Sequence, residues 1–398
     1  MKPADHKRAR RLRLARIIAV PMIAVAGSVL WNYYQGSPAR KLIILIADFR
    51  PSDTQTRDLT KNILDQLSKA WSQHDGIELR SIEEVEPIQS GSEIARARGR
   101  EHNAAIVVWG SYEKSGAEGL VNVHFEMLHN RVIFRLTPER KETVSVAAAR
   151  LDSITIRQPL SAEMTYLTLM ALGFSGYCAQ DFERAIASFS DAILQNSAPE
   201  QVENLGIPFA YRGISYLYSY RKSGDQRQID SAIADFNEAL KIAPNDPLTY
   251  FNRGLAYFEK REYDLSIADY DQSLRLKPDY AEAYFARGNS YDEKGAHHRA
   301  IADYDQAIRL NPRHAAAYNN RGDTYLKKGQ IDSAIADYDQ AINLRPTLAI
   351  TYLSRGEAYA IKGDKENAMA NFDKALEITK TTDQRQRAIR AIEELNSN

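Results

Sequence analysis

The chain contains a single cysteine, Cys178, among its 398 residues. One cysteine excludes an internal disulfide framework and every metal site built from several thiolates. Cys178 lies in an apolar stretch with helical spacing, so we expect it to serve as a small buried hydrophobic side chain. Because a chain without disulfides tolerates either side of a membrane, the cysteine count leaves the compartment open.

The sequence also lacks a net charge, since 52 basic and 52 acidic side chains balance. The balance is uneven, because residues 1–16 carry seven basic side chains and one acidic one. The rest of the chain holds 45 basic and 51 acidic side chains, a formal net charge of minus six. Phosphate binding needs a basic face on the folded part, so we do not expect nucleic acid as a partner.

Motifs of catalysis and cofactor binding are missing as well. No glycine-rich loop ends in Lys-Ser/Thr, and neither His-Glu-x-x-His nor Gly-x-Ser-x-Gly occurs. His297 and His298 are adjacent at a predicted hairpin, where neighbouring side chains rarely converge on one metal, and His124 and His129 lack a third ligand. We therefore expect no enzyme, no cofactor and no metal site.

Residues 17–34 form an apolar run that follows the basic tail and ends in Trp31, Tyr33 and Tyr34. A basic flank, an uncharged core and aromatic residues at the far end are typical of a membrane helix. As a helix the run spans about 27 Å, slightly short of a ~30 Å hydrocarbon core, a deficit that a thinner bilayer can absorb. We predict a single-pass anchor in the cell membrane, with residues 1–16 cytoplasmic and the bulk outside or in the periplasm.

A cleaved secretory signal is the alternative interpretation of the same run. Ala24-Val25-Ala26 is a plausible cleavage site, and cleavage would leave a secreted chain. The apolar run continues past this site through Val29, Leu30 and Trp31, where a mature amino terminus normally turns polar. A cytosolic amphipathic arm fits less well than either, because the run has no polar face. The uncleaved anchor is the favoured hypothesis.

Residues 41–158 alternate strand-like and helix-like patterns. Near-continuous apolar runs indicate strands buried on both faces, and strict alternation after Gly110 indicates half-exposed antiparallel strands. Such an order predicts a small α/β sandwich with a mixed sheet. The expected strands are residues 41–48, 77–82, 104–109, 120–127, 131–136 and part of 143–156, and the expected helices are residues 54–74 and 93–103.

Two segments of this region carry a resemblance to a known family. Residues 44–49 read Ile-Leu-Ile-Ala-Asp-Phe, and residues 104–111 read Ala-Ala-Ile-Val-Val-Trp-Gly-Ser after a predicted helix. Both segments resemble the TolB amino-terminal domain, a bacterial envelope module that meets partner proteins. The resemblance implies a second protein contact and carries no catalytic motif.

From Pro247 onward the sequence repeats with a period of 34 residues. The period and pattern resemble the tetratricopeptide repeat family, which implies paired helices stacked into an all-α superhelical solenoid over residues 163–382. The positions that recur are Gly254, Gly288, Gly322 and Gly356; Tyr257, Tyr291, Tyr325 and Tyr359; and Pro244, Pro278, Pro312 and Pro346. The six expected repeats are 166–199, 206–246 with a seven-residue insertion, 247–280, 281–314, 315–348 and 349–382, and residues 383–398 form a capping helix.

The recurring residues have physical roles within each hairpin. The glycine at the eighth place of the first helix lets the second helix approach, and an aromatic ring such as Tyr304 fills the space beside it. Gly295, Gly329 and Gly363 fall where a helix ends and a left-handed residue is needed. These positions therefore build the framework and leave the others available for binding.

The resemblance also implies where a ligand binds. In this family the second, fifth, ninth, twelfth and thirteenth places of each repeat face the concave groove, which here is apolar at one end and acidic in the middle. We expect it to hold a protein or peptide segment with apolar anchors and basic residues, and we count no Lys or Arg among its places. The predicted groove residues are Leu248, Phe251, Leu255, Phe258, Glu282, Phe285, Asn289, Asp292, Asn319, Asp323, Leu326, Leu353 and Glu357.

The second helices of three repeats carry an Asp-Tyr-Asp motif, such as Asp303 to Asp305. Because residues i and i+2 of a helix do not face each other, the two carboxylates diverge and a metal ladder is not expected. An arginine at the seventh place of each first helix can pair with one aspartate of each set. These arginines are Arg253, Arg287, Arg321 and Arg355.

Together these features predict a membrane-anchored scaffold for protein–protein interaction. A regulatory or assembly subunit of an envelope or signalling complex is the alternative, in which the anchor only localises the repeats. A hydrolase would need a polar pocket in residues 41–158 that the sequence does not reveal.

Overall fold

The computed structural model describes residues 42–47, 77–82, 91–102, 104–115, 118–128, 153–159, 165–195, 206–379 and 381–397. The predicted basic tail, the apolar run of residues 17–34, the helix at 54–74 and the strand at 131–136 lie outside these residues. Within the described residues, none of the helices combines the length and the apolar character that crossing a bilayer requires.

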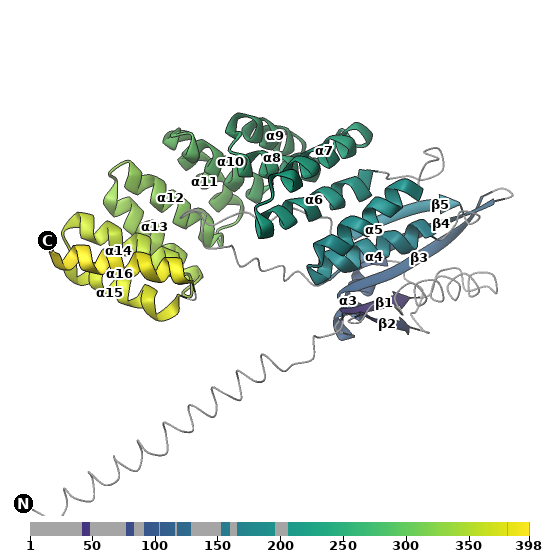
Figure 1. Ribbon diagram of the computed structural model, residues 1–398, viewed down its shortest axis with the longest axis horizontal. Helices are drawn as coiled ribbons and strands as arrows, with labels where there is room; N and C mark the ends of the chain where they lie inside the picture. The colour runs from purple at the N-terminus through teal and green to yellow at the C-terminus, as the bar shows by residue number, and fades with distance from the viewer. Residues whose placement is uncertain are drawn as a thin grey trace, which may run out of the picture.

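A five-stranded sheet occupies one end of the molecule (Figure 1). Its strands lie in the order β2-β1-β3-β4-β5, and β1 pairs in parallel with both β2 and β3. The pairs β3–β4 and β4–β5 are antiparallel, and only residues 116 and 117 separate β3 from β4. The strands are β1 (Leu42–Ala47), β2 (Ile77–Ile82), β3 (Ile106–Ser115), β4 (Glu118–Met127) and β5 (Ser153–Pro159).

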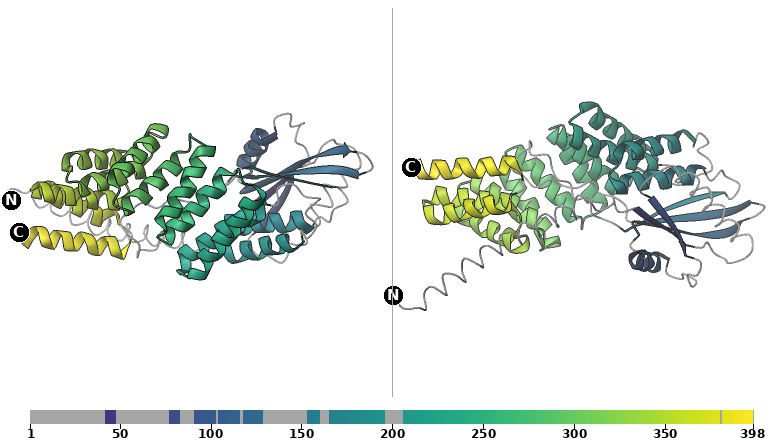
Figure 2. Two further views of the ribbon diagram at one scale, coloured as in Figure 1. Left: turned by 90° about the horizontal axis from the view of Figure 1, so that it is seen from above. Right: turned by 60° about the horizontal axis from the view of Figure 1, so that its bottom comes forward.

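Helices cover both faces of this sheet (Figures 1 and 2). Along β3, Val107 packs on the side of helix α3 (Gly91–Glu101), while Ile106 and Val108 join the core formed with helix α4 (Thr165–Ala179). This alternation follows from the two-residue period of a strand. The sheet therefore shares one hydrophobic core with the first helical repeat.

The remaining described residues form helical hairpins that run from the sheet to the C-terminus (Figure 1). Each hairpin corresponds to one expected repeat, with a first and a second helix. The helices are α4 and α5 (Phe182–Gln195), α6 (Gly206–Ser223) and α7 (Gln226–Ile242), α8 (Pro247–Glu259) and α9 (Tyr263–Leu276), α10 (Ala281–Glu293) and α11 (His297–Leu310), α12 (Ala315–Lys327) and α13 (Ile331–Leu344), and α14 (Ala349–Lys362) and α15 (Lys365–Ile378).

The framework glycines act as the sequence predicts. A Cβ atom added to Gly288 or Gly322 would lie 2.7 Å from the ring of Tyr304 or Tyr338, closer than real Cβ contacts. Both rings are fully buried. The two helices of a hairpin can therefore pack at this distance only because the eighth place has no side chain.

A left-handed residue follows each of the six first helices. The prediction for Gly295, Gly329 and Gly363 is confirmed, with φ of +75°, +72° and +86°. Arg261 ends α8 in the same left-handed conformation, with φ of +61°, although it has a side chain.

The insertion lengthens both helices of its repeat. Helix α6 has 18 residues and α7 has 17, against 13 or 14 in the helices of the later hairpins.

Helix α16 (Thr382–Ser397) closes the array at its C-terminal end. Ala388 is buried, and Ile392 and Leu395 pack on the core of α14 and α15. The opposite face of α16 is polar, so the helix covers the last repeat and presents charge to water.

Candidate functional site

All thirteen predicted groove residues lie on the first helices α8, α10, α12 and α14. The apolar ones at the fifth and ninth places are buried among neighbouring helices rather than open to a ligand, namely Phe251, Leu255, Phe285 and Leu353. Leu248, Phe258 and Leu326 are half-buried, and Glu282 is exposed. The available surface is therefore concentrated at the second and twelfth places.

Asn289, at the ninth place of its repeat, forms a hydrogen bond to the next repeat. Asn289 Oδ1 accepts from the hydroxyl of Tyr304 and from Nδ2 of Asn320, both at 2.9 Å. Tyr304 lies on α11 and Asn320 on α12, so one amide of α10 connects three helices. A buried amide with partners of this kind fixes the register of neighbouring helices.

Asp292 is the most strongly partnered carboxylate in the groove. It accepts from Lys327 Nζ at 2.6 Å and from the Thr324 hydroxyl at 3.0 Å, and its other contact is with His297 Nδ1 at 2.9 Å. The residue is only 4% exposed. Lys327 occupies the thirteenth place of its repeat, so the count of no Lys or Arg among the groove places was wrong, and the groove centre is not purely acidic.

Asp323 lies one repeat further along. It accepts hydrogen bonds from the Tyr338 hydroxyl at 2.7 Å and from Asn319 Nδ2 at 3.1 Å. Burial raises the pKa of Asp323 to about 7, against the opposing effect of hydrogen bonds from Tyr338 and Ser354. This carboxylate therefore titrates near neutral pH.

Glu357 is engaged by the capping helix. Its two carboxylate oxygens accept from Arg387 Nε at 2.9 Å and Nη2 at 2.7 Å. Of the four predicted groove carboxylates, Glu282 thus remains the exposed one. The sequence located these residues on the correct helices but could not show that several of them contact one another.

The arginines of the seventh place lie on the other side of the first helices. A step of two residues turns a helix by about 200°, so the seventh place points away from the fifth and the ninth. Arg287 donates from Nε and Nη2 to Asp303 at 2.8 and 2.7 Å, and from Nη1 to Asp271 of the preceding repeat at 2.5 Å. Arg321 repeats the arrangement with Asp337 and Asp305.

We call each such set an arginine seam, consisting of the arginine, the residue 16 places after it and the residue 16 places before it. The expected ion pairing is confirmed and is more extensive than predicted, because both aspartates of an Asp-Tyr-Asp motif are used by two different arginines. The ring centroids of Tyr284 and Tyr318 lie 5.4 and 5.5 Å from the guanidinium carbons of Arg287 and Arg321, respectively.

Across the part of the chain that the structure describes, no group of His, Cys, Asp or Glu side chains is placed to hold a metal ion.

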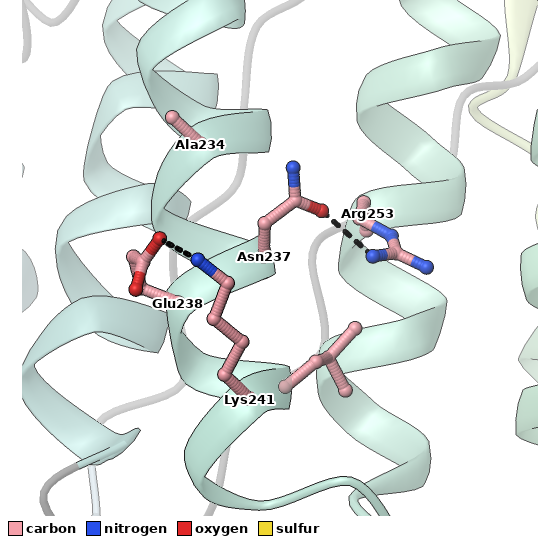
Figure 3. A pocket seen from close by; sticks show the side chains of 6 residues that line it. Ala234, Asn237, Glu238, Lys241 and Arg253 are labelled. Atoms are coloured by element: carbon pink, nitrogen blue, oxygen red, sulfur yellow. Dashed lines mark hydrogen bonds and ion pairs between the residues drawn. The ribbon is translucent and has the colours of Figure 1, made fainter.

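The seam between α7 and α8 differs from these two. Arg253 donates to Asp269 from Nε and Nη2, but the residue 16 places before it is Asn237, whose Oδ1 accepts from Nη1 at 2.7 Å. An open pocket of about 490 Å³ lies at this seam (Figure 3). Its lining residues are Ala234, Asn237, Glu238, Leu240, Lys241 and Arg253.

Comparison with known proteins identifies the repeats. The family described as TPR repeat matches residues 220–260, 255–295, 288–329 and 322–363, and the family described as tetratricopeptide repeat matches residues 349–382. Among the curated proteins, no match was found.

Several solved structures are similar to part of the chain. MamA is 29% identical over 44% of this chain and 96% of its own length, with a TM-score of 0.37. A thermophilic TPR protein of Thermus thermophilus is 25% identical over 47% of this chain and 98% of its own, with a TM-score of 0.40. YrrB, described as a TPR protein with an unusual peptide-binding site, is 21% identical over 52% of this chain and 97% of its own, with a TM-score of 0.39.

Proposed function

We propose, from the tetratricopeptide repeats that the chain carries over residues 220–382, that it is a scaffold for protein–protein interaction and holds a polypeptide segment against its first helices. Repeats of this kind present a continuous surface that no single hairpin could form. The proposal assigns the chain to binding rather than to catalysis.

The observation that carries the proposal is the contrast between framework and groove places. The glycine of the eighth place and the ring beside it recur in every repeat, with the same close approach. The second and twelfth places, by contrast, differ from one repeat to the next, as Leu248, Glu282, Ala316 and Ile350 illustrate at the second place. A surface that varies on a constant framework supports recognition of one particular sequence.

The exposed groove chemistry favours a ligand with apolar anchors and one basic residue. Phe258 and Leu326 are half-buried and offer apolar contact, while Glu282 is exposed on α10. Asp292 contributes little free charge, because Lys327 already neutralises it. The basic residue of the ligand is therefore assigned to Glu282 rather than to Asp292 or Asp323.

We further propose that residues 17–34 anchor the chain in a membrane and that the TolB-like residues 41–158 form a second protein contact. The basic flank and the aromatic end of the apolar run support the first proposal. Fractionation with protease protection tests it: recovery of the intact chain in the soluble cytosol would reject the anchor.

Site-specific photocrosslinking tests the scaffold proposal. A photoreactive side chain in place of Leu326 on α12 should capture one polypeptide, whereas the same group in place of exposed Ala336 on α13 should not. Once that polypeptide is purified, Glu282→Lys should weaken its binding about tenfold, the loss of one charge-assisted contact. Glu366→Lys on α15, also exposed, is the matched control with the same charge change.

Equal capture from both faces, or equal affinity of the two lysine variants, would contradict the proposal. If the captured polypeptide is an enzyme whose activity changes on binding, the protein is instead a regulatory subunit.

A further inference from the structure

The arginine seams differ in how many carboxylates surround the guanidinium. Arg287 and Arg321 each contact two aspartates, one from their own repeat and one from the preceding repeat. At the α7–α8 seam Asn237 replaces the second aspartate, so among the described residues the carboxylate of Asp269 is the single one that Arg253 contacts. The substitution leaves this guanidinium with less negative charge around it than its two neighbours have.

The hydrogen bond with Arg253 fixes the orientation of the Asn237 amide. A guanidinium has only donors, so the amide must turn Oδ1 toward it and Nδ2 away from it (Figure 3). Nδ2 makes no hydrogen bond to any residue that the structure describes. Asn237 therefore offers two N–H donors at the pocket wall.

Two other arginines, Arg355 and Arg212, also contact a single carboxylate among the described residues, but the neutral groups beside them are already engaged. Asn371, beside Arg355, donates its Nδ2 to the Asn367 carbonyl at 2.7 Å. Ser190, beside Arg212, donates its hydroxyl to the Ile186 carbonyl at 2.7 Å. Asn237 differs from both because its donor is still available.

Further donors lie next to it. Arg253 uses three of its five N–H groups on Asp269 and Asn237, which leaves two without a hydrogen bond to the residues that the structure describes. Lys241 pairs with Glu238 one turn away, but these side chains are 69% and 47% exposed. An exposed pair of this kind contributes about 0.5 kcal/mol or less, so the ammonium can turn to another carboxylate at little cost.

We propose that the pocket between α7 and α8 binds the side-chain carboxylate of a glutamate on a partner polypeptide, through Asn237 Nδ2, the Arg253 guanidinium and Lys241 Nζ. The incoming carboxylate supplies the second negative charge that Asp271 and Asp305 supply at the next two seams, while Asn237 keeps its hydrogen bond with Arg253 Nη1. This inference rests on the proposed function of the chain as a polypeptide-binding scaffold, and it adds a contact on the side opposite to the groove.

A glutamate side chain fits the pocket better than a free anion. The volume of about 490 Å³ exceeds what a bare carboxylate fills, and Ala234 and Leu240 provide apolar contact for the methylene groups. The pocket is open, so a side chain can enter it from a polypeptide that lies across the second helices. A free acid such as acetate would leave that apolar wall unused.

The test is binding of a labelled peptide to the full-length protein in detergent, followed by fluorescence anisotropy at low ionic strength. The probe is an acetylated, amidated peptide of four Gly-Glu units, and its Gly-Gln counterpart is the neutral control. We expect the wild type to bind the Gly-Glu probe at least tenfold more tightly. Asn237→Asp should remove most of this difference, because the introduced carboxylate would pair with Arg253 as Asp271 pairs with Arg287.

Asn343→Asp on α13 is the matched control, since it makes the same charge change at an exposed asparagine away from the pocket. It should leave the affinity within twofold, and the thermal melts of both variants should show that they fold. Equal affinity of Asn237→Asp and the wild type would overturn the proposal, as would equal binding of the two probes. Displacement of the probe by an equal concentration of acetate would overturn the choice of a polypeptide side chain.

The result of this peptide-binding test does not depend on whether the groove binds a ligand. A negative result here, with Leu326 crosslinking intact, removes the second contact and leaves the scaffold function in place. Loss of crosslinking at Leu326 with intact binding of the Gly-Glu probe would remove the groove and leave the pocket contact in place.

Discussion

Charged side chains in the array differ in how completely their neighbours compensate them. Asp303 has two hydrogen bonds from Arg287, whereas Asp323 is held by the hydroxyl of Tyr338 and the amide of Asn319. Burial raises the pKa of both carboxyl groups, and the arginine opposes this rise at Asp303. A neutral hydrogen bond compensates a buried charge less well than a guanidinium does, so we expect pH to act on the fold at Asp323.

The first prediction concerns the pH dependence of stability. Asp323 has a folded pKa of about 7, above the unfolded value of about 3.9, so its contribution to stability is fully present below pH 4 and is lost as pH rises through 7. Asp323→Asn removes this titration. The difference in thermal midpoint between this variant and the wild-type protein should therefore grow from pH 5 to pH 8, as measured by circular dichroism. A constant difference over that range would show that Asp323 does not titrate there.

The second prediction concerns the arginine seams. Arg287→Met should cost about 3 kcal/mol, because it leaves the buried carboxylate of Asp303 without its partner. Arg309→Met, on the exposed face of α11, should change stability by less than about 0.5 kcal/mol. Urea denaturation of the two variants measures the contrast. Similar losses would mean that the seams are solvated pairs of little energetic weight.

At the scale of the element, each hairpin depends on a close approach and on a left-handed turn. The approach of α12 and α13 requires that Gly322 have no Cβ, since the Tyr338 ring occupies the space. The turn after α12 requires a positive φ at Gly329. The corresponding turn after α8 uses Arg261, so this repeat carries backbone strain that the later ones avoid.

The third prediction follows from that strain. Arg261→Gly should stabilise the protein by about 0.5–1 kcal/mol, because glycine adopts a positive φ without steric cost. Gly329→Ala should destabilise it by about 1 kcal/mol for the same reason in reverse. Chemical denaturation measures both changes. A loss of stability in Arg261→Gly would indicate that the arginine side chain contributes more than its backbone costs.

At the scale of the whole molecule, the sheet and the repeats are joined through one core. Phe125 of β4 and Phe174 of α4 have ring centroids 5.3 Å apart, and both side chains are buried. Helix α4 has no strongly polar face. This composition suits its position, because the sheet covers one side of the helix and α5 and α6 cover others. The sheet therefore closes the N-terminal end of the array, as α16 closes the C-terminal end.

The fourth prediction tests this connection. Phe125→Ala should cost about 3–4 kcal/mol and should speed amide hydrogen exchange in α4 and α5. Exchange in α14 and α15 should change little, because each repeat contacts only its neighbours. Mass spectrometry of the exchanged full-length protein separates these segments. A uniform increase along the array would show that the repeats unfold as one unit.

The sequence alone determined the helical hairpins, their period of 34, the left-handed glycines and the pairing of arginine with aspartate. These features depend on residues close in the chain or at a fixed spacing, so a periodic pattern reveals them. The location of the groove residues on α8, α10, α12 and α14 follows from the same pattern.

Only the tertiary structure decided which of those residues are used within the molecule. Lys327 meets Asp292 from the next repeat, and the Asn237 amide is oriented by Arg253 of the next helix. The packing of Phe125 on Phe174 likewise joins residues that no periodicity relates. Each contact depends on how one hairpin packs on its neighbour or on the sheet. It also depends on which polar groups this packing shields from water. A repeat pattern gives the position of a side chain on its helix, but its partner is set by the angle and distance between helices.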